Sequence, residues 1–245
     1  MFYTRKCGEI EESDFGSEQT LCGWLQDTRN LGGIAFLQLR DITGVIQLTL
    51  LKKKLGDENF KSWANINRES IILVRGIVKE NKEAPGGVEM LPDNIELMNE
   101  AETPLPLGVI DKIDSEIETR LNARYLDLRK TEIAANFQIR AAISGAVHKY
   151  LRRENFLEVQ TPKIIASATE GGTSLFEMKY FDKTAYLAQS PQLYKQMLMS
   201  GGLERVYEVG PAFRAEEHNT PRHLNEFISI DIEMSFADDD VVMGV

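Results

Sequence analysis

The sequence has few cysteines and no long apolar run. Its two cysteines, Cys7 and Cys22, lack the spacing of metal ligands, so we expect free thiols in a reducing cytosol. No apolar stretch approaches the length that crosses a bilayer. The first residues are followed by Gly, Glu and Ser rather than by the apolar core of a secretion signal. These absences predict a cytoplasmic protein with no membrane partner.

Positive charge is also scarce. Lys and Arg number 28 against 38 Asp and Glu, a net charge of −10, and this balance argues against a nucleic-acid partner. The acidity is concentrated near the end, because residues 201–245 include three basic and ten acidic side chains. Basic clusters remain upstream at Lys52-Lys53-Lys54 and within 120–130, where a solvated surface is an equally good interpretation.

Residues 20–98 alternate apolar and polar side chains in short segments, a pattern typical of strands. Five strands are expected, at 20–26, 34–40, 45–51, 71–78 and 94–98. Turn signals such as Pro85-Gly86-Gly87 separate them. A helix-like stretch at 55–67 lies between the third and fourth. Five short strands with one helix in this place predict an OB-type β-barrel.

A different pattern follows the barrel. Thr103-Pro104-Leu105-Pro106 reads as a domain exit, and a charged connector runs over 111–130. A helix is expected at 131–153, then alternating strands and helices, so the second region is α+β. The apolar face of that helix consists of Ile133, Phe137, Ile139, Ile143, Val147 and Leu151. We therefore expect a barrel domain at 1–103, a hinge at 104–130 and a second domain at 131–245.

Strand parity places Phe36 and Gln47 on the barrel face that turns away from the core. An exposed ring can stack on an unpaired base, which is worth roughly 1–3 kcal/mol. A glutamine amide can read a base edge. The alternative, favoured when these two residues are considered alone, is a shifted register or a ring covered by a loop.

Residues 206–216 and 226–234 read as two strands joined by a loop, with one polar face. That face combines arginine, acidic groups and an aromatic ring: Arg214, Glu216, Phe227, Ser229, Asp231 and Glu233. The loop adds Glu217, His218, Arg222 and His223. A planar guanidinium binds phosphate well, so the set suits a nucleotide with an amine-bearing co-substrate. The alternative is an amphipathic hairpin whose polar face is in water.

Several segments resemble one family. Residues 210–227, Gly-Pro-Ala-Phe-Arg-Ala-Glu-Glu-His-Asn-Thr-Pro-Arg-His-Leu-Asn-Glu-Phe, resemble motif 2 of class IIb aminoacyl-tRNA synthetases, especially the archaeal and eukaryotic aspartyl branch. Residues 155–162 resemble motif 1, the dimerisation element, and 124–129 resemble the hinge signature. Residues 170–176 resemble the loop that closes over the amino acid. The resemblance implies an OB-type anticodon-binding barrel followed by an incomplete class II antiparallel-sheet catalytic domain, in a homodimer formed through motif 1.

The resemblance also implies ATP as a substrate. Arg214 matches the motif 2 arginine that contacts the α-phosphate and the amino-acid carboxylate, where it would stabilise developing charge. Glu216 matches the acidic partner near adenine, and Phe227 matches the ring that stacks on it. Arg222, His223 and Leu224 match the segment that holds the outer phosphates and the adenine edge. The implied reaction is in-line formation of an adenylate, then acyl transfer to tRNA, with no covalent enzyme intermediate.

The amino acid implied is aspartate. Gln192 and Lys195 are three residues apart and so share a helix face. A lysine ammonium pairs with a carboxylate but offers no acceptor to an amide nitrogen, which favours aspartate over asparagine. In the family pattern, Glu170 would bind the substrate ammonium, with Arg214 also contacting aspartate. For Lys195 taken alone, a surface lysine is the ordinary interpretation.

The barrel residues that match the family's anticodon site are Arg29, Phe36, Gln47 and Pro85. The implied partner is tRNA(Asp). In the family, tolerance of tRNA(Asn) tracks residues near the third anticodon base. Pro85 matches the tolerant form, whereas Gln26 is not the histidine often paired with it. We therefore expect charging of tRNA(Asn) as well.

The family pattern continues beyond residue 245 with motif 3 and the magnesium ligands. We expect no metal ligands within the chain, Mg²⁺ use by the whole protein, and little ligase activity from these 245 residues alone. Three alternatives remain: a tRNA-binding module without catalysis, an asparaginyl-tRNA synthetase, and a synthetase-derived asparagine synthetase. The intact Arg214 and Lys195 argue against the first, Lys195 against the second and the barrel against the third.

Overall fold

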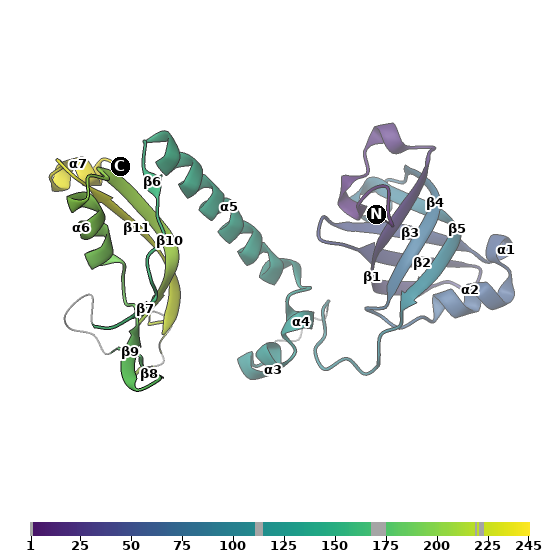
Figure 1. Ribbon diagram of the computed structural model, residues 1–245. Coiled ribbons are helices and arrows are strands. Elements are labelled where there is room, and N and C mark those ends of the chain that lie inside the picture. Colours follow the sequence, from purple (N-terminus) through teal and green to yellow (C-terminus); the bar gives the residue numbers. More distant parts are fainter. Residues whose placement is uncertain (1, 111–114, 168–174, 219, 221–222) are drawn as a thin grey trace. The chain divides into compact units, whose positions relative to one another are not determined.

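The computed structural model describes residues 2–110, 115–167, 175–218, 220 and 223–245 (Figure 1). The chain divides into two compact units, Met1–Ala135 and Asn136–Val245, and each is described by itself. This division does not test the domain limits expected at 103 and 130, which stay a prediction. The residues that precede 136, the connector included, belong to the first unit.

The first unit is built on a closed five-stranded barrel. Its strands are β1 (Glu18–Asn30), β2 (Ile34–Arg40), β3 (Val45–Leu51), β4 (Ile71–Glu80) and β5 (Val88–Asn99). They are ordered β1-β2-β3-β5-β4, with β3 and β5 parallel and the other neighbours antiparallel. The predicted OB-type barrel is confirmed, and β2 and β3 have the predicted bounds.

The barrel core follows strand parity, because alternate side chains point inward. Residues with an exposed fraction of zero or 1% alternate along the strands: Leu21, Leu25, Ala35, Leu37, Leu39, Ile46, Leu48, Leu50, Ile72 and Val74. Phe60 closes the core from the helical connection between β3 and β4. The outward face of β2 and β3 is thereby free for polar residues and Phe36.

The single helix expected at 55–67 is wrong in its extent. Two short helices are present, α1 (Lys52–Leu55) and α2 (Asp57–Ala64), and Gly56 separates them. Gly56 has a φ of +80°, a left-handed conformation that interrupts a right-handed helix and that glycine adopts without steric cost. The turn η3 (Pro85–Gly87) likewise contains two glycines with positive φ.

The fifth strand begins earlier than expected, at Val88 rather than at 94. Pro92 interrupts the sequence pattern, since proline cannot donate to a ladder. The structure places it opposite Gly76, at a register shift of the β4–β5 pair. A Cβ on Gly76 would lie 2.3 Å from the Leu91 carbonyl oxygen, so only glycine fits there. Similarly, a Cβ on Gly23 would lie 2.4 Å from the Arg40 oxygen.

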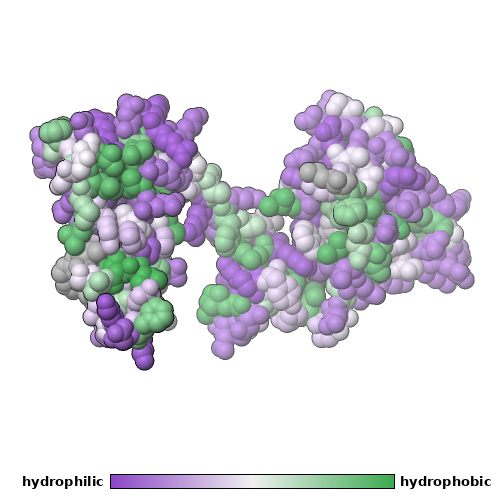
Figure 2. Space-filling view, in the orientation of Figure 1, coloured by the Kyte–Doolittle hydropathy of each residue, from purple (hydrophilic) through white to green (hydrophobic). Residues whose placement is uncertain are grey.

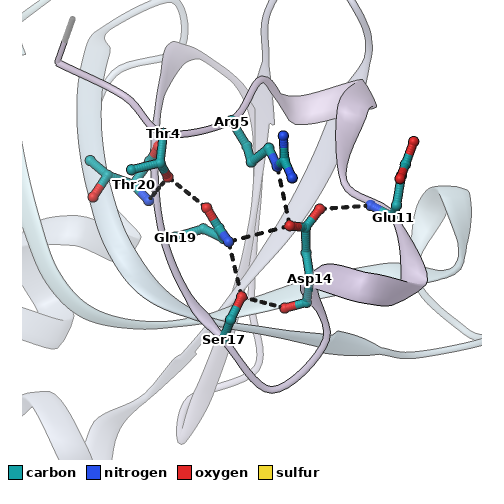
Figure 3. A network of polar contacts seen from close by, with 7 residues as sticks. All are labelled: Thr4, Arg5, Glu11, Asp14, Ser17, Gln19 and Thr20. Atoms are coloured by element: carbon teal, nitrogen blue, oxygen red, sulfur yellow. Dashed lines mark hydrogen bonds and ion pairs between the residues drawn. The ribbon is translucent and has the colours of Figure 1, made fainter.

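The N-terminal segment, with 3-10 turns η1 (Cys7–Glu9) and η2 (Glu12–Asp14), is fastened to β1 by polar contacts around Asp14 (Figure 3). Asp14 accepts from the Glu11 backbone N–H at 3.1 Å and from Arg5 Nε at 3.1 Å. The backbone donor and Arg5 lower the pKa of Asp14. Cys7 is buried, its thiol pKa is raised by burial, and both predicted free thiols are confirmed.

The connector contains α3 (Ile117–Asn122) and α4 (Arg124–Asp127), joined by ion pairs from Arg120 and Arg124 to the buried Asp127. Arg129 then reaches the barrel, where it donates to Glu69 at 2.9 Å and lies 5.1 Å over the Trp24 ring. Side chains from the connector and the barrel thus share one buried ion-pair network within the first unit.

The long helix α5 (Thr131–Arg153), whose bounds match the prediction, begins in the first unit and continues from Asn136 in the second, which also contains two small sheets. One sheet has the order β11-β10-β6, with β6 (Leu157–Glu158), β10 (Arg205–Phe213) and β11 (Glu226–Met234). The other has β7 (Ile164–Ile165), β9 (Lys183–Leu187) and β8 (Glu177–Tyr180). Helices α6 (Gln192–Ser200) and α7 (Asp239–Met243) complete the unit. The predicted α+β class is confirmed.

Helix α5 packs against the sheet only near its end. Leu151 is 5% exposed and lies in a core cluster with Phe156 and Tyr207. Earlier on the same predicted apolar face, Ile139 and Ile143 are 57% and 55% exposed. Figure 2 shows hydrophobic residues at the surface along α5. Among the residues that the structure describes, no helix is long and apolar enough to cross a bilayer.

Candidate functional site

A pocket of about 370 Å³, here called the barrel pocket, lies on the outward face of β2 and β3. It brings together all four residues predicted for an anticodon site: Arg29, Phe36, Gln47 and Pro85. The remaining lining residues are Asp27, Thr28, Gln38, Asn81 and Glu83. The register explains the arrangement, because Gln38 pairs with Gln47 directly beside Phe36. The expected shared face is confirmed, whereas the roles of its residues stay predictions.

Gln47 is oriented by Glu89, a carboxylate that is only 4% exposed. The amide nitrogen of Gln47 donates to Glu89 Oε2 at 3.2 Å. Thr49 and Asn81 donate to the same oxygen at 2.6 and 2.9 Å, and Lys79 lies 2.9 Å from Oε1. Burial raises the pKa of a carboxyl, but these donors outweigh it and lower the pKa of Glu89 to about 2. The Gln47 amide nitrogen is therefore engaged by Glu89.

We expect Glu89→Gln to lower the free energy of unfolding of the barrel by about 1–3 kcal/mol at pH 7, since it unbalances a buried charged network. The folded-state pKa of about 2 lies below the ordinary 4.5, so the carboxylate stabilises the fold fully above pH 4.5. That contribution is lost as the pH falls from 4.5 towards 2. The difference between wild type and variant should therefore narrow over this window.

Urea unfolding followed by tryptophan fluorescence measures this difference, because the only two tryptophans, Trp24 and Trp63, both lie in the first unit. Glu58→Gln, an exposed change on α2, serves as the control. If the difference in free energy of unfolding between Glu89→Gln and wild type stayed constant down to pH 3, the lowered pKa of Glu89 would be contradicted.

Gln26 does not line the barrel pocket but acts on a residue that does. Its amide nitrogen donates to Gln38 Oε1 at 3.2 Å. Its amide oxygen accepts from Arg40 Nη1 at 3.3 Å, and Arg40 in turn donates to Glu69 at 2.8 Å. Gln26 therefore fixes which amide group of Gln38 faces the pocket.

The second candidate site is the polar face of the β10–β11 hairpin. Glu208 pairs with Asp231 and Gly210 with Ser229, so alternate residues of both strands share this face, as predicted. Phe227, Ser229 and Asp231 are half-buried, whereas Ile228 and Ile230 on the opposite face are 45% and 51% exposed. The alternative of a polar face turned to water is therefore wrong.

Arg214 and Phe227 meet on this face. The Arg214 guanidinium carbon lies 5.3 Å from the centre of the Phe227 ring. The strand β10 ends at Phe213 rather than at 216, and Arg214 is held by a backbone bond from its N–H to the Asn225 oxygen. The Glu216 N–H donates to Asn225 Oδ1 at 3.0 Å, which keeps Glu216 beside the strand end. The strand limit was missed because the alternation continues into the turn.

Lys195 is a deeply buried charged group of this site, with 3% exposure. Helix α6 directs its Nζ atom towards β11, where Asp231 and Glu233 each lie 3.4 Å away and the Ile232 carbonyl 3.1 Å. Gln192, on the same helix face as predicted, donates to Glu233 at 3.5 Å. The arrangement places one ammonium between two carboxylates, a set that can hold a zwitterionic amino acid.

The other predicted residues are more dispersed. His223 is exposed and its Nδ1 lies 2.6 Å from the Thr220 hydroxyl, and Leu224 is 58% exposed. Glu170 and Arg222 lie outside the described residues. Among the described residues, no group of three or more His, Cys, Asp or Glu side chains could hold a metal ion.

Residues 155–162 are tied to the hairpin by buried polar bonds. Glu208 is 3% exposed and accepts from the Thr161 N–H at 2.9 Å and its hydroxyl at 2.8 Å. Tyr207 donates to Glu158 at 2.9 Å, and Glu158 also accepts from Arg152 of α5 at 2.6 Å. These donors lower the pKa of Glu158. The long helix is thus anchored to the strand that leads to Arg214.

Sequence reasoning missed Glu89 and Glu208, which hold the two sites in shape. Glu89 lies at the start of β5, in the part of the strand that Pro92 concealed. Glu208 lies on the polar face of β10, where it is buried against Thr161 and Lys163. Both glutamates lie on the polar face of their strand, so alternation by itself gave no signal of their burial.

The comparisons with known proteins agree with this geometry. Residues 116–245 match the family model of class II tRNA synthetases (D, K and N). The chain belongs to this synthetase family. Residues 19–98 match the model of the OB-fold nucleic acid binding domain, which is the barrel described above. The predicted family is therefore confirmed, and the class II match begins in the connector and includes the whole second unit.

Relatives of this synthetase are similar over nearly the whole chain. It is 57% identical to an aspartate–tRNA(Asp/Asn) ligase of Methanopyrus kandleri, covering 91% of this chain and 52% of the relative. It is 52% identical to an aspartate–tRNA(Asp) ligase of Picrophilus torridus, covering 99% and 56%. A solved structure, asparaginyl-tRNA synthetase of Pyrococcus horikoshii with asparaginyl-adenylate, aligns with a TM-score of 0.92 and 33% identity, covering 100% and 56%. The chain thus spans about half the length of these relatives.

Proposed function

We propose that the whole protein attaches L-aspartate to tRNA through an aspartyl-adenylate. The observation that carries this proposal is Lys195, buried between Asp231 and Glu233 on the same strand face as Phe227. The higher identity to aspartate ligases than to the asparaginyl enzyme supports the same choice of amino acid. A cytoplasmic location is part of this proposal.

Aspartate has one ammonium and two carboxylates, and the site offers groups of both signs. Lys195 would take the side-chain carboxylate, because its three N–H donors cannot satisfy the donating nitrogen of asparagine. Asp231 and Glu233 hold the lysine in place and would face the substrate ammonium, together with Glu170 of the family pattern. Charge complementarity therefore favours aspartate over its amide.

ATP would bind beside Arg214 and Phe227. The guanidinium lies over one face of the ring, so adenine can stack on the other face. Arg214 would neutralise the charge that develops on the α-phosphate as the substrate carboxylate attacks and pyrophosphate leaves. Glu216, Arg222, His223 and Leu224 are proposed to hold the rest of the nucleotide. A hydroxyl of the tRNA 3′ end then attacks the acyl carbon, and AMP departs.

The barrel pocket would read the anticodon. An unpaired base can stack on Phe36, and the Gln47 oxygen, fixed by Glu89, can accept a hydrogen bond from a base N–H. Pro85 lines this pocket, and Gln26 sets the amide of Gln38 within it. With Arg29 at the rim, these contacts would select tRNA(Asp), and we propose tRNA(Asn) as a second substrate.

The test is charging by the whole protein with unmodified transcripts. We expect aspartate to be transferred to tRNA(Asp) and, at a rate within about tenfold, to tRNA(Asn), which corresponds to a loss of no more than about 1.4 kcal/mol in contacts with the anticodon. Transcripts with an altered middle anticodon base are the control and should lose most activity. If tRNA(Asn) is not charged, the proposed dual specificity is refuted, whereas the proposed aspartate ligase activity is not affected.

We further propose a homodimer through α5 and the residues that follow it. Ile139 and Ile143 are more than half exposed, and apolar side chains in such number on one helix face suit a second copy. Analytical ultracentrifugation of the whole protein at micromolar concentration tests this proposal. A sedimentation coefficient typical of a monomer would contradict the dimer.

A further inference from the structure

The outward face of β2 and β3 extends beyond the barrel pocket. Gln38 pairs with Gln47, then Phe36 with Thr49, then Ile34 with Leu51 at the end of both strands. Alternate residues share a face, so Ile34 and Leu51 continue the surface that carries Phe36. The last pair is apolar, and Ile34 is 39% exposed.

A second pocket, here called the end pocket, lies at this apolar pair. Its volume is about 610 Å³, and it is lined by Gly33, Ile34, Leu51, Lys52, Lys53 and Asp57. None of these residues lines the barrel pocket. A backbone bond of 3.1 Å from the Lys52 N–H to the Gly33 oxygen joins the two sides of its floor. The end pocket is therefore a separate hollow on the same continuous strand face.

Its rim is basic. Lys52 pairs with Asp57 at 3.2 Å, and Lys54 pairs with Asp93. Lys53 is exposed and forms no ion pair with any residue that the structure describes. An apolar floor beside an available ammonium suits a nucleotide, because the base covers the floor while the phosphate meets the lysine. An apolar peptide would use the floor but would leave Lys53 without a partner.

We propose that the end pocket binds the nucleotide next to the anticodon triplet in the same RNA strand. This inference rests on the proposed anticodon reading by the barrel pocket. Ile34 lies two residues from Phe36, about 6.6 Å at a strand rise of about 3.3 Å per residue, so RNA seated on Phe36 passes Ile34 next. The base contacts Ile34 and Leu51, and its phosphate pairs with Lys53.

The experiment measures binding of a labelled anticodon stem-loop of tRNA(Asp) to the whole protein. Ile34→Thr, which keeps a β-branched side chain in the strand, is expected to weaken binding about fivefold by removing part of the apolar surface that the base covers. Lys53→Gln is expected to weaken it about threefold and to reduce the slope of log affinity against log salt by about one. Lys6→Gln, the same charge change in the N-terminal segment, should have no effect.

Stem-loops with an abasic site on either side of the triplet complete the test. With one of them, the wild-type chain and Ile34→Thr should bind equally, because the base that Ile34 contacts is gone. The proposal is overturned if Ile34→Thr binds intact RNA as tightly as wild type, or if its deficit persists with both abasic stem-loops. Tryptophan fluorescence confirms that each variant is folded.

The two proposals fail in different ways. If the barrel pocket does not read the anticodon, the affinity of the wild-type protein for the stem-loop will stay the same when bases of the triplet are substituted. If only the end-pocket proposal is wrong, the affinity will depend on the bases of the triplet. It will then not change when Ile34 or Lys53 is substituted or when a flanking base is removed.

Discussion

Replacing Lys195 with methionine should lower aspartate-dependent pyrophosphate exchange by the whole protein about 10²- to 10⁴-fold. Removing one partner of a buried ion pair costs about 3–5 kcal/mol, and each 1.4 kcal/mol is tenfold. The ammonium lies between Asp231 and Glu233 at 3.4 Å, so its loss also leaves two carboxylates facing the substrate carboxylate. The KM for aspartate should rise, while the KM for ATP, bound near Arg214, changes little.

Two further variants separate substrate binding from folding. Lys195→Arg keeps the charge and should lose less activity than Lys195→Met, although its planar fork does not reproduce the ammonium. Lys61→Met, an exposed change on α2, is the matched control and should be active. Aspartate activation by a folded Lys195→Met protein at the wild-type rate would refute the assigned role.

Replacing Glu69 with glutamine should lower the free energy of unfolding of the first unit by about 3–5 kcal/mol, since it leaves the buried Arg40 and the partly buried Arg129 without their counter-charge. Glu69 is 4% exposed and accepts from Arg40 at 2.8 Å and Arg129 at 2.9 Å. It also has a φ of +66°, a conformation that a non-glycine residue adopts only when its surroundings hold it there. Urea unfolding followed by the fluorescence of Trp24 and Trp63 measures the loss.

Glu58→Gln on α2 is the control and should change the stability by less than about 0.5 kcal/mol. The double variant Arg40→Gln/Glu69→Gln should be more stable than the sum of the two single losses predicts, because the two side chains interact directly. If the losses in free energy of unfolding of the two single variants were additive in the double variant, the contact between Arg40 and Glu69 would contribute nothing to stability. A Glu69→Gln protein as stable as wild type would contradict the network altogether.

Local alternation predicted much of the fold. The bounds of β2, β3 and α5 agree with the sequence pattern, because each is a segment whose period decides its type. The errors in the predicted element bounds lie where one residue interrupts the apolar-polar pattern or where the pattern continues past the end of a strand. Gly56 divided an expected helix, Pro92 concealed the start of a strand, and the alternation beyond Phe213 continued into a turn.

The candidate sites were predicted in part. Parity brought Phe36 and Gln47 to one face, and helix spacing brought Gln192 and Lys195 to another. Strand parity does not predict which residues from other parts of the chain contact a given side chain. For that reason the carboxylate that orients Gln47, Glu89, was missed.

The sequence by itself determined the family, the order of the barrel and the class II synthetase part, and the faces on which the candidate site residues lie. These properties depend on short-range spacing, which the chain carries at every position. The tertiary structure alone decided that Lys195 is buried between two acids and that Glu69 bridges Arg40 and Arg129. Such pairings join residues far apart in the chain, and their energy depends on a burial that exists only after the elements have packed.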